Sequence, residues 1–466
     1  MSTATAVPRG VEPDPRSRRR QHRAWYFYDW ANSAYVTTTA TVLLGPYLIA
    51  VAEAAACPGL SADQSCENDL SVLGLPVAPG ALVGYAVAFS TIFSALLLPL
   101  VGAVVDRTAR QKQMLGGFAW LGAAAAASMY FIAGSNWQLG VALLLVANVS
   151  LGASLVVYDA ILCHIATPDE RDAVSSRGWA LGYLGGFVLL ALNLGLVLSH
   201  EALGLSEGYA VRLSLLSAGV WWALFTLIPF LGLRNRKPVD VAPVSREARG
   251  SLVRESFGQL VDTLRHLRGY KQTWMFLLAY LFFTDGIQTV IGSSSIYGSQ
   301  ELGFSSAQLI QTILLVQIVA FGGALVFGRA AYRFGAKRCI LGGLGLWLVV
   351  VVIGYFLPAG QFGLFMGLAV LIGLVLGGTQ ALSRSLYSQL VPVGREAEYF
   401  SLYQAGERGT SWFGAFLFSL MFQLTGSYRP AIISLMVFFV VGGLLLSRVD
   451  VRRGIIEAGN TPPAVV

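Results

Sequence analysis

The sequence predicts an all-α membrane protein with twelve transmembrane helices, arranged as two six-helix halves. Three observations lead to this fold class: the composition, the spacing of long uncharged segments, and the distribution of lysine and arginine. Of the 466 residues, 55% are hydrophobic and only 12% are charged, and the mean hydropathy is +0.64. Soluble domains carry about 25% charged residues. The composition therefore excludes an ordinary soluble enzyme, a disordered chain and a nucleic-acid-binding protein.

The uncharged segments place the individual helices. A helix needs about 20 apolar residues to cross the hydrocarbon core of a bilayer. Segments of about this length or longer follow one another along the chain, and Asp285 interrupts one of them. Turn residues at 134–136 and 358–360 divide two longer segments into two helices each. The twelve helices are expected within residues 29–53, 69–106, 112–159 (two helices), 177–201, 212–234, 271–301, 301–329, 338–384 (two helices), 409–428 and 430–447.

The basic residues give the orientation. If the N-terminus is cytoplasmic, nearly all of the 32 lysines and arginines fall on the cytoplasmic side, as the positive-inside rule requires. The exceptions are Arg212 and Arg429 outside and Arg408 within a span. Both termini are therefore expected in the cytoplasm, and the net charge of +7 is a topology signal.

A cytoplasmic linker divides the chain. We expect an N-terminal tail over 1–24, a first bundle over 25–233, a linker over 234–271, a second bundle over 272–448 and a C-terminal tail over 449–466. The second part of the linker places Val253, Phe257, Leu260, Val261 and Leu264 on one helical face. This pattern is typical of an amphipathic helix on the membrane surface.

The cysteines and histidines of this chain do not indicate a catalytic or metal-binding site. Cys57 and Cys66 both fall in the first external loop, where they either form a disulfide or remain free thiols. The four histidines are scattered, so no metal site is expected. The sequence also lacks a phosphate-binding P-loop and any arrangement typical of a nucleophilic enzyme. We therefore expect neither an enzyme nor a cofactor.

Two short basic turns occupy equivalent places in the two halves. The first contains Gly102, Asp106, Arg107, Arg110 and Lys112. The second contains Gly328, Arg333 and Lys337. Glycine permits close approach of helices, and the charges can pair across the loop or with helix ends. These turns are predicted to act as a latch on one conformation, or else they are plain topology signals.

The first turn resembles the loop signature of the major facilitator superfamily. Several further stretches resemble the vacuole-effluxer family, whose fungal members are autophagy-related vacuolar amino-acid exporters. These stretches lie at residues 28–35, 182–186, 285–290, 296–303 and 377–385. The resemblance implies two pseudo-symmetric bundles, a cavity lined by the first, fourth, seventh and tenth helices, and a monomeric functional unit. The second turn lacks the aspartate of the first, so a latch there must differ.

Polar residues inside apolar spans are costly and need a reason. We expect Asp285, followed by Asp29 and Asp159, to couple transport to protons, and Arg384 to hold a carboxylate or phosphate of a substrate. The expected lining of the cavity comprises Asn32, Ser33, Tyr35, Gln288, Gln380, Arg384, Tyr387 and Gln404.

Each of these assignments has a structural alternative. Asp29 and Asp159 either are solvated or pair with loop arginines such as Arg177, and Asp285 instead bonds a neighbouring helix. Arg384 is otherwise a positive-inside anchor. Glu407 pairs with Arg408 or neutralises Arg384. Trp25, Trp137, Trp221 and Trp222 lie near span ends, which is typical of interfacial anchors.

The sequence therefore predicts a secondary active transporter for a small metabolite, working by alternating access in the plasma membrane. The resemblance implies that the metabolite is an amino acid and that the direction of transport is efflux. Protons are a candidate coupling ion, and the lipid bilayer is the remaining partner. A drug or lipid-related exporter of the same fold is the alternative within transport. A receptor or scaffold that does not transport is the alternative from another class.

Overall fold

The computed structural model describes residues 14–59, 66, 68–72, 74–235 and 269–466. The amphipathic helix expected around residues 253–264 lies outside the described residues. Helices dominate the described chain, in agreement with the predicted all-α class. One short hairpin lies in the loop that was expected to be external. Its strands β1 (Leu70–Val72) and β2 (Leu75–Val77) pair antiparallel.

The first half begins with a long composite helix, in which α1 (Pro15–Ala34), a π-helical segment η1 (Tyr35–Leu43) and α2 (Leu44–Ala56) follow without a break. Short 3₁₀ turns, η2 (Pro79–Ala81) and η3 (Met129–Phe131), flank later helices. The other helices of this half are α3 (Leu82–Asp106), α4 (Gln111–Ser128), α5 (Trp137–Ile165), α6 (Arg171–Leu198) and α7 (Glu207–Gly232).

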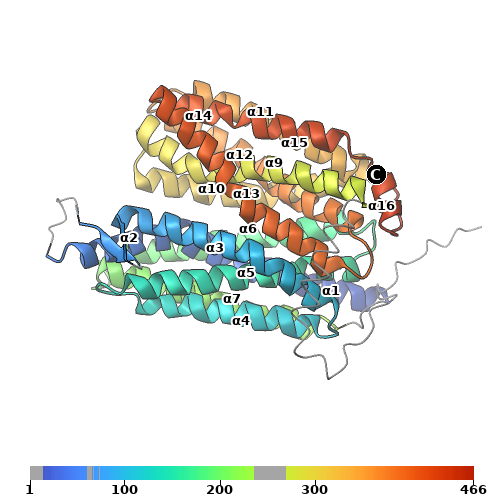
Figure 1. The fold of residues 1–466 in the computed structure, drawn as a ribbon, viewed down its shortest axis with the longest axis horizontal. Helices are drawn as coiled ribbons and strands as arrows, with labels where there is room; N and C mark the ends of the chain where they lie inside the picture. Colours follow the sequence, from blue (N-terminus) through green and yellow to red (C-terminus); the bar gives the residue numbers. More distant parts are fainter. Residues whose placement is uncertain (1–13, 60–65, 67, 73, 236–268) are drawn as a thin grey trace, which may run out of the picture.

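The second half repeats this pattern. Its first helix, α9 (Lys271–Ile296), also ends in a π-helical segment, η6 (Tyr297–Glu301). The remaining helices are α10 (Ser306–Phe334), α11 (Ala336–Phe356), α12 (Phe362–Leu390), α13 (Glu396–Thr425), α14 (Tyr428–Ser434), α15 (Met436–Ser447) and a terminal helix α16 (Val451–Glu457). The two halves lie side by side along their length, and α1 begins at the same end as the C-terminus (Figure 1). We call this end the predicted cytoplasmic end.

Local chemistry explains where several helices start and stop. Ser305 accepts a hydrogen bond from the backbone of Gln308, whose side chain bonds back to Ser305, forming a capping box at the start of α10. Gly335 has a φ of 83° and separates α10 from α11. A positive φ favours glycine, which has no Cβ. The sharp reversal between these two helices therefore depends on glycine.

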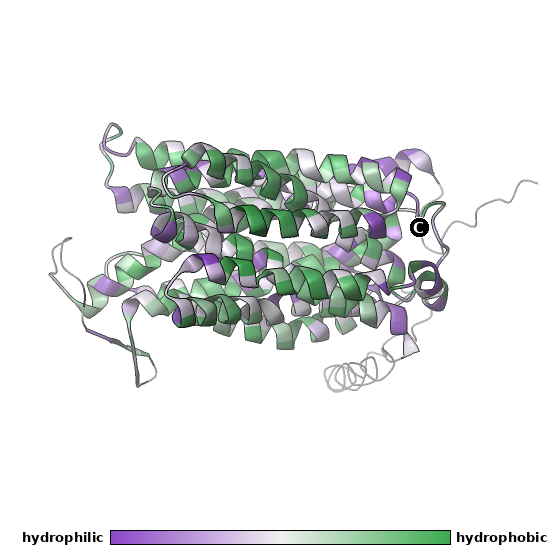
Figure 2. Cartoon of the chain, turned by 90° about the horizontal axis from the view of Figure 1, so that it is seen from above, coloured by the Kyte–Doolittle hydropathy of each residue, from purple (hydrophilic) through white to green (hydrophobic). Residues whose placement is uncertain are grey.

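The described residues contain eleven helices long and apolar enough to cross a membrane. Hydrophilic residues gather towards the two ends of the bundle, and hydrophobic residues dominate its middle (Figure 2). The protein is thus a multi-pass membrane protein. The helix α13 covers the residues expected for the eleventh span, but it is not among the eleven and carries Glu396, Glu398, Glu407 and Arg408. The count of twelve and the cytoplasmic location of the termini stay predictions.

Glycines bring the two halves into close contact along two equivalent seams. A Cβ on Gly102 of α3 would lie 2.5 Å from the carbonyl oxygen of Ala397 and 2.8 Å from the Cβ of Ser401, both on α13. A Cβ on Gly328 of α10 would lie 2.5 Å from the hydroxyl of Ser176 on α6. The glycine that opens each basic turn therefore packs against a serine of the opposite half.

The C-terminal segment crosses the predicted cytoplasmic end. The side-chain amide of Asn460 donates to the carbonyl oxygens of Gln389 and Val391 at the end of α12, at 2.9 and 2.7 Å. Further along, the backbone N–H of Ala464 donates to Asp169 of the first half at 2.7 Å. The segment therefore ties the α5–α6 loop to the second half.

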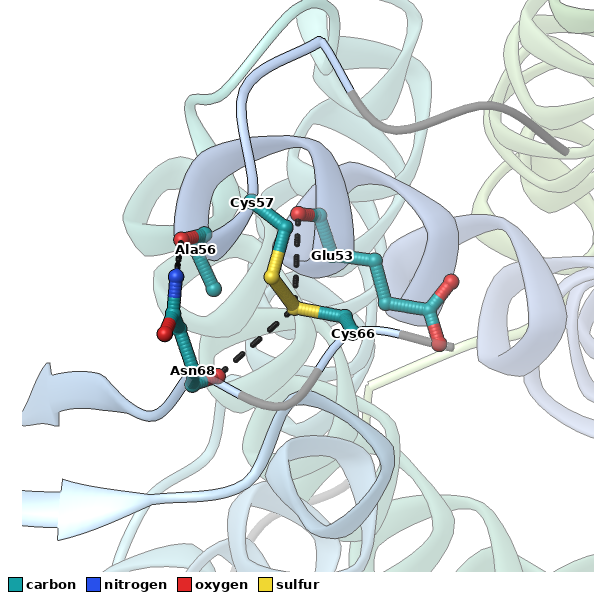
Figure 3. Close-up of a disulfide and its surroundings, with 5 residues drawn as sticks. All are labelled: Glu53, Ala56, Cys57, Cys66 and Asn68. Carbon is teal, nitrogen blue, oxygen red and sulfur yellow. Dashed lines mark hydrogen bonds between the residues drawn. A yellow bond between two sulfur atoms is a disulfide. The ribbon is translucent and has the colours of Figure 1, made fainter. Parts of the chain in front are cut away.

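A disulfide joins Cys57, directly after α2, to Cys66, and their Cα atoms are 5.8 Å apart (Figure 3). Beside it, the side-chain amide of Asn68 donates to the carbonyl oxygen of Ala56 at 3.2 Å. These contacts fasten the start of the α2–α3 loop to the end of α2.

The disulfide predicts a mass difference. Without reductant, the intact protein should be two hydrogens lighter than the reduced chain, and peptide mapping should place the bridge at Cys57 and Cys66. A Cys57→Ser variant should lose this difference. Alkylation of both thiols in unreduced protein would contradict the bridge.

Candidate functional site

The buried guanidinium of Arg384 lies where the two halves meet. It belongs to α12 and is 2% exposed. Its Nη2 is 3.0 Å from Oδ2 of Asp29 on α1, and its Nη1 is 3.4 Å from Oδ1 of Asp159 on α5. Both carboxylates are buried as well. One cation from the second half therefore bridges two anions from the first half.

Other polar groups complete the hydrogen bonding of this cluster. The Nε of Arg384 donates to the hydroxyl of Ser175 at 3.0 Å, and its Nη2 donates to the Ser175 carbonyl oxygen at 3.1 Å. Tyr158 donates its hydroxyl to Asp29 at 2.8 Å. The side-chain amide of Gln404 on α13 donates to Asp159 at 2.8 Å. Buried charges are tolerated when they are paired and hydrogen-bonded in this way.

Aromatic rings enclose the guanidinium. Its central carbon lies 4.8 Å from the ring centre of Trp25, 5.3 Å from that of Tyr158 and 5.2 Å from that of Trp179. Trp25 and Tyr158 stack on each other with centres 4.2 Å apart. Cation–π attraction adds to the ion pairs, and desolvation strengthens it.

Glycine makes room for the cluster on α6. A Cβ on Gly178 would lie 2.7 Å from Oδ2 of Asp29 and 3.1 Å from Nη2 of Arg384. One turn later, a Cβ on Gly182 would meet the hydroxyl oxygen of Ser33 at 2.8 Å. The helix α6 can therefore approach α1 and α12 only because these positions have no side chain.

Towards the predicted cytoplasmic end, hydrogen bonds close the interface between the halves. The guanidinium of Arg171 donates to the carbonyl oxygen of Ser388 at 2.6 Å. The thiol of Cys163 donates to the same oxygen at 3.5 Å, and Ser385 donates to Asp172 at 2.5 Å. These contacts all join α5 or α6 to α12.

The predicted latch is also closed at this end. Both oxygens of the Asp106 carboxylate accept backbone N–H groups of the second half, from Ala397 at 2.9 Å and from Glu398 at 2.8 Å. These two N–H groups belong to the first turn of α13, where a helix has unsatisfied donors and favours negative charge. Asp106 therefore caps a helix of the opposite half.

The described contacts of Lys112, Arg110 and Lys337 stay within their own halves. Lys112 lies 5.3 Å from the ring centre of Phe230 on α7. Lys337 donates to the carbonyl oxygens of Ser447 and Val449 at the end of α15. Arg110 bonds Thr108 through its backbone N–H, and Arg333 is exposed. A latching role for Arg107, Arg110, Lys112, Arg333 and Lys337 stays a prediction.

Two contacts join the halves on the side of the Arg384 cluster that faces away from the predicted cytoplasmic end. Tyr183 on α6 donates its hydroxyl to Gln380 on α12 at 2.6 Å. Gln317 on α10 donates its amide to Thr37 of η1 at 2.7 Å. Gln380 and Gln404, both expected to line the cavity, therefore take part in the interface between the halves.

Other expected lining residues make hydrogen bonds inside a single half. Asn32 donates to the carbonyl oxygen of Tyr28 one turn earlier, and Tyr35 donates to Asn148. Tyr387 donates to the carbonyl oxygen of Tyr399 and is fully buried. Their described contacts serve packing within each half, and a contact of these residues with substrate stays a prediction.

Asp285 lies within the second half, between α9 and α13. Its Oδ2 accepts the backbone N–H of Gly414 at 2.9 Å, and its Oδ1 is buried without a hydrogen-bond partner among the described residues. The contact of Asp285 with α13 matches the structural alternative, a bond between helices. Proton coupling by Asp285 stays a prediction.

Glu407 forms a second polar group in this half. Its carboxylate accepts hydrogen bonds from Tyr280 at 2.8 Å and from Gln288 at 3.2 Å. Arg384 contacts Asp29 and Asp159, and these carboxylates fill the neutralising role that Glu407 was expected to offer. The pairing of Glu407 with Arg408 stays a prediction.

Two interpretations of the sequence were wrong. Asp29 and Asp159 pair with Arg384 rather than with a loop arginine such as Arg177. Trp25 is fully buried and donates its indole N–H to the carbonyl oxygen of Tyr158, so it is not an interfacial anchor. Trp222 is also fully buried and stacks on Tyr35. Sequence reasoning did not select Trp25, Tyr158, Ser175, Gly178 or Trp179 for the site.

Two solved transporter structures share this arrangement of helices. The proton:xylose symporter XylE superposes with a TM-score of 0.70 at 14% identity, over 95% of this chain and 98% of that chain. The human organic anion transporter MFSD10 superposes with a TM-score of 0.66 at 15% identity, over 93% of this chain and 100% of that chain. The fold is therefore that of the major facilitator superfamily of secondary transporters.

Sequence comparison narrows this class. A family described as vacuole effluxer Atg22 like matches residues 17–459, and the chain belongs to this family. An uncharacterized MFS-type transporter of Bacillus subtilis, YxiO, is 34% identical over 433 residues, which cover 92% of this chain and 94% of that protein. Autophagy-related protein 22 of Saccharomyces cerevisiae is 25% identical over 497 residues, covering 94% and 92% of the two chains. The family and the structural neighbours are transporters and not enzymes.

The Gly102 seam predicts a conformational effect. Gly102→Ala should weaken the contact between the halves at the predicted cytoplasmic end by about 1–3 kcal/mol, because the new methyl group overlaps the backbone of α13. Cys163 is the natural reporter, since its buried thiol contacts α12 across the interface. In a Cys339→Ser background, Gly102→Ala should label faster with N-ethylmaleimide at Cys163.

Gly117→Ala is the matched control, because a Cβ at that position of α4 would have no neighbour within 4 Å. It should leave labelling of Cys163 unchanged. Equal labelling rates for Gly102→Ala and Gly117→Ala would refute the role of the seam.

Proposed function

We propose that this secondary transporter exports amino acids, or metabolites with the same pair of charges, by alternating access coupled to protons. One observation carries the proposal: Arg384 of the second half is buried between Asp29 and Asp159 of the first half. Opening the cytoplasmic end separates the halves and so requires a replacement for these ion pairs. A ligand that supplies the replacement makes the movement possible.

An amino acid carries the two charges that this replacement needs. Its carboxylate fits the guanidinium of Arg384, which holds carboxylates through two parallel hydrogen bonds. Its ammonium group fits Asp29 and Asp159. The aromatic surfaces of Trp25 and Trp179 offer contact to an apolar side chain. The ion pairs between Arg384 and the two aspartates would thus be replaced by ion pairs between these side chains and the substrate.

The charge balance of the cluster supports coupling to protons. Two carboxylates face one guanidinium, so the fully ionised cluster carries an excess negative charge in a buried place. An uncompensated buried charge is costly, and a proton on either aspartate removes it. Proton binding and substrate binding therefore act on the same pair of side chains.

The movement follows from the contacts at the predicted cytoplasmic end. Rocking of the two halves would break the bonds of Asp106 to α13 and of Arg171 to Ser388. The bundles at 25–233 and 272–448 would move as the two rigid units, and a single chain contains both. Efflux is supported by the description of the family, and the plasma membrane is supported by the bacterial relative.

Flux into proteoliposomes tests the proposal directly. Purified protein should transport one class of labelled amino acids with saturable kinetics, and an imposed pH gradient should accelerate it. The same amino acids should change the rate at which Cys163 reacts with N-ethylmaleimide. Altered labelling without flux would favour a receptor, and the absence of both in folded protein would remove amino acids as substrates.

Arg384 gives the sharpest substitution. Arg384→Gln should reduce flux at least ten-fold and destabilise the protein by about 3–5 kcal/mol, because two buried carboxylates lose their partner. The triple variant Arg384→Gln/Asp29→Asn/Asp159→Asn removes the unpaired carboxylates as well. It should recover thermal stability but not flux. Wild-type flux in the triple variant would overturn the assignment.

Two sites are candidates for the proton-coupling group, the interface cluster and Asp285, and substitutions distinguish them. If the interface cluster couples protons, Asp159→Asn should abolish pH-driven flux, while exchange of substrate against substrate should persist with a raised KM because Asp159 also faces the ammonium group. If Asp285 couples protons, Asp285→Asn should do so instead. Glu457→Gln is the control, because Glu457 pairs with Arg453 on the terminal helix α16, away from both sites. Unchanged pH dependence in both aspartate variants would exclude both candidates.

A further inference from the structure

We propose that the second half binds the phosphate of an anionic phospholipid at the predicted cytoplasmic end, between α11, α15 and α16. A cavity of about 570 Å³ opens there, between the start of α11, the end of α15 and the terminal helix. It is separate from the Arg384 cluster, and its chemistry is different.

The lining of the cavity is strongly basic. Lys337 and Arg338 from α11, Arg448 after α15 and Arg452 from α16 contribute four cations. Asp450 contributes a carboxylate, and Val466, the last residue of the sequence, also lines the cavity. Arg338, Arg448 and Arg452 are exposed, and none of them forms an ion pair within the described ranges. The next residue along, Arg453, pairs with Glu457 at 2.7 Å. Three cations of the cavity are therefore available to an anionic ligand.

Lys337 fixes the geometry of the site. Its ammonium group donates to the carbonyl oxygens of Ser447 at 2.9 Å and Val449 at 2.8 Å, which joins the start of α11 to the end of α15. An ammonium group has three N–H donors, so a third remains for a ligand. The helix α11 begins at Ala336 without a side-chain cap, and its first N–H groups add positive potential at the same place.

The position favours a lipid over a soluble phosphate. Both α11 and the segment containing α15 are among the helices able to span a membrane, so their ends lie at headgroup depth. Leu341, one turn into α11 from Lys337, also lines the cavity. On α15, Leu444 and Val440 are 57% and 42% exposed, one and two turns before Arg448. A phospholipid can place its phosphate among the cations and its acyl chains along these apolar side chains.

Native mass spectrometry of the delipidated full-length protein tests this site. The probes are phosphatidylglycerol, phosphatidylcholine with the same acyl chains, and soluble glycerol phosphate. Phosphatidylglycerol should bind most tightly, since only it combines a net anionic headgroup with acyl chains. Equal binding of phosphatidylcholine, or binding of glycerol phosphate as tight as that of phosphatidylglycerol, would overturn the proposal.

Two adjacent arginines provide a matched comparison. Arg452→Gln should weaken phosphatidylglycerol binding about five-fold, and the Arg338→Gln/Arg448→Gln double variant about 25-fold, since each cation near an anionic lipid contributes a similar increment. Arg453→Gln should change binding less than two-fold. All three arginines of the cavity are exposed, so their substitution should leave the melting temperature unchanged. Equal losses in Arg452→Gln and Arg453→Gln, or no loss in the double variant, would refute a defined site.

Discussion

The ion cluster of Arg384, Asp29 and Asp159 is the constraint on which the arrangement of the two halves depends. Isolated charges are very costly inside a membrane protein, and removing one partner of a buried pair costs about 3–5 kcal/mol. Here the partners belong to different halves. Neither half supplies both charges of these ion pairs, so the cluster holds the two halves together.

The residues around the cluster offset the cost of burying its charges. Tyr158 and Gln404 satisfy the carboxylate oxygens, and Ser175 satisfies the guanidinium. Gly178 lets α6 approach without displacing the ion pair. The two seams marked by Gly102 and Gly328 repeat the same close contact between the halves. Asp106 has no acidic counterpart, because the equivalent position holds the exposed Tyr332. The halves are therefore alike in packing and unlike in hydrogen bonding.

Much of the fold could be predicted from the sequence, because spans are determined by local composition. The uncharged segments gave the order of the helices, and the two glycine turns pointed to the repeated seams. Asp29, Asp159, Arg384 and Gln404 stood out as polar residues in apolar surroundings. Their pairing was not predictable, since Asp29 and Arg384 are 355 residues apart. Trp25 was misinterpreted for a related reason: burial of a tryptophan near a span end depends on which helix covers it.

The C-terminal segment has a practical consequence for handling the protein. A Cβ on Gly335, at the turn between α10 and α11, would lie 2.8 Å from the backbone of Val466, and Ala464 contacts the first half. An affinity tag or fluorescent protein fused after Val466 would begin at this contact. It would disturb the packing of Val466 on Gly335 and the nearby bond of Ala464 to Asp169. Fusions are better placed before α1 with a spacer, because Arg18 near the start of α1 pairs with Glu170 of the α5–α6 loop at 3.2 Å.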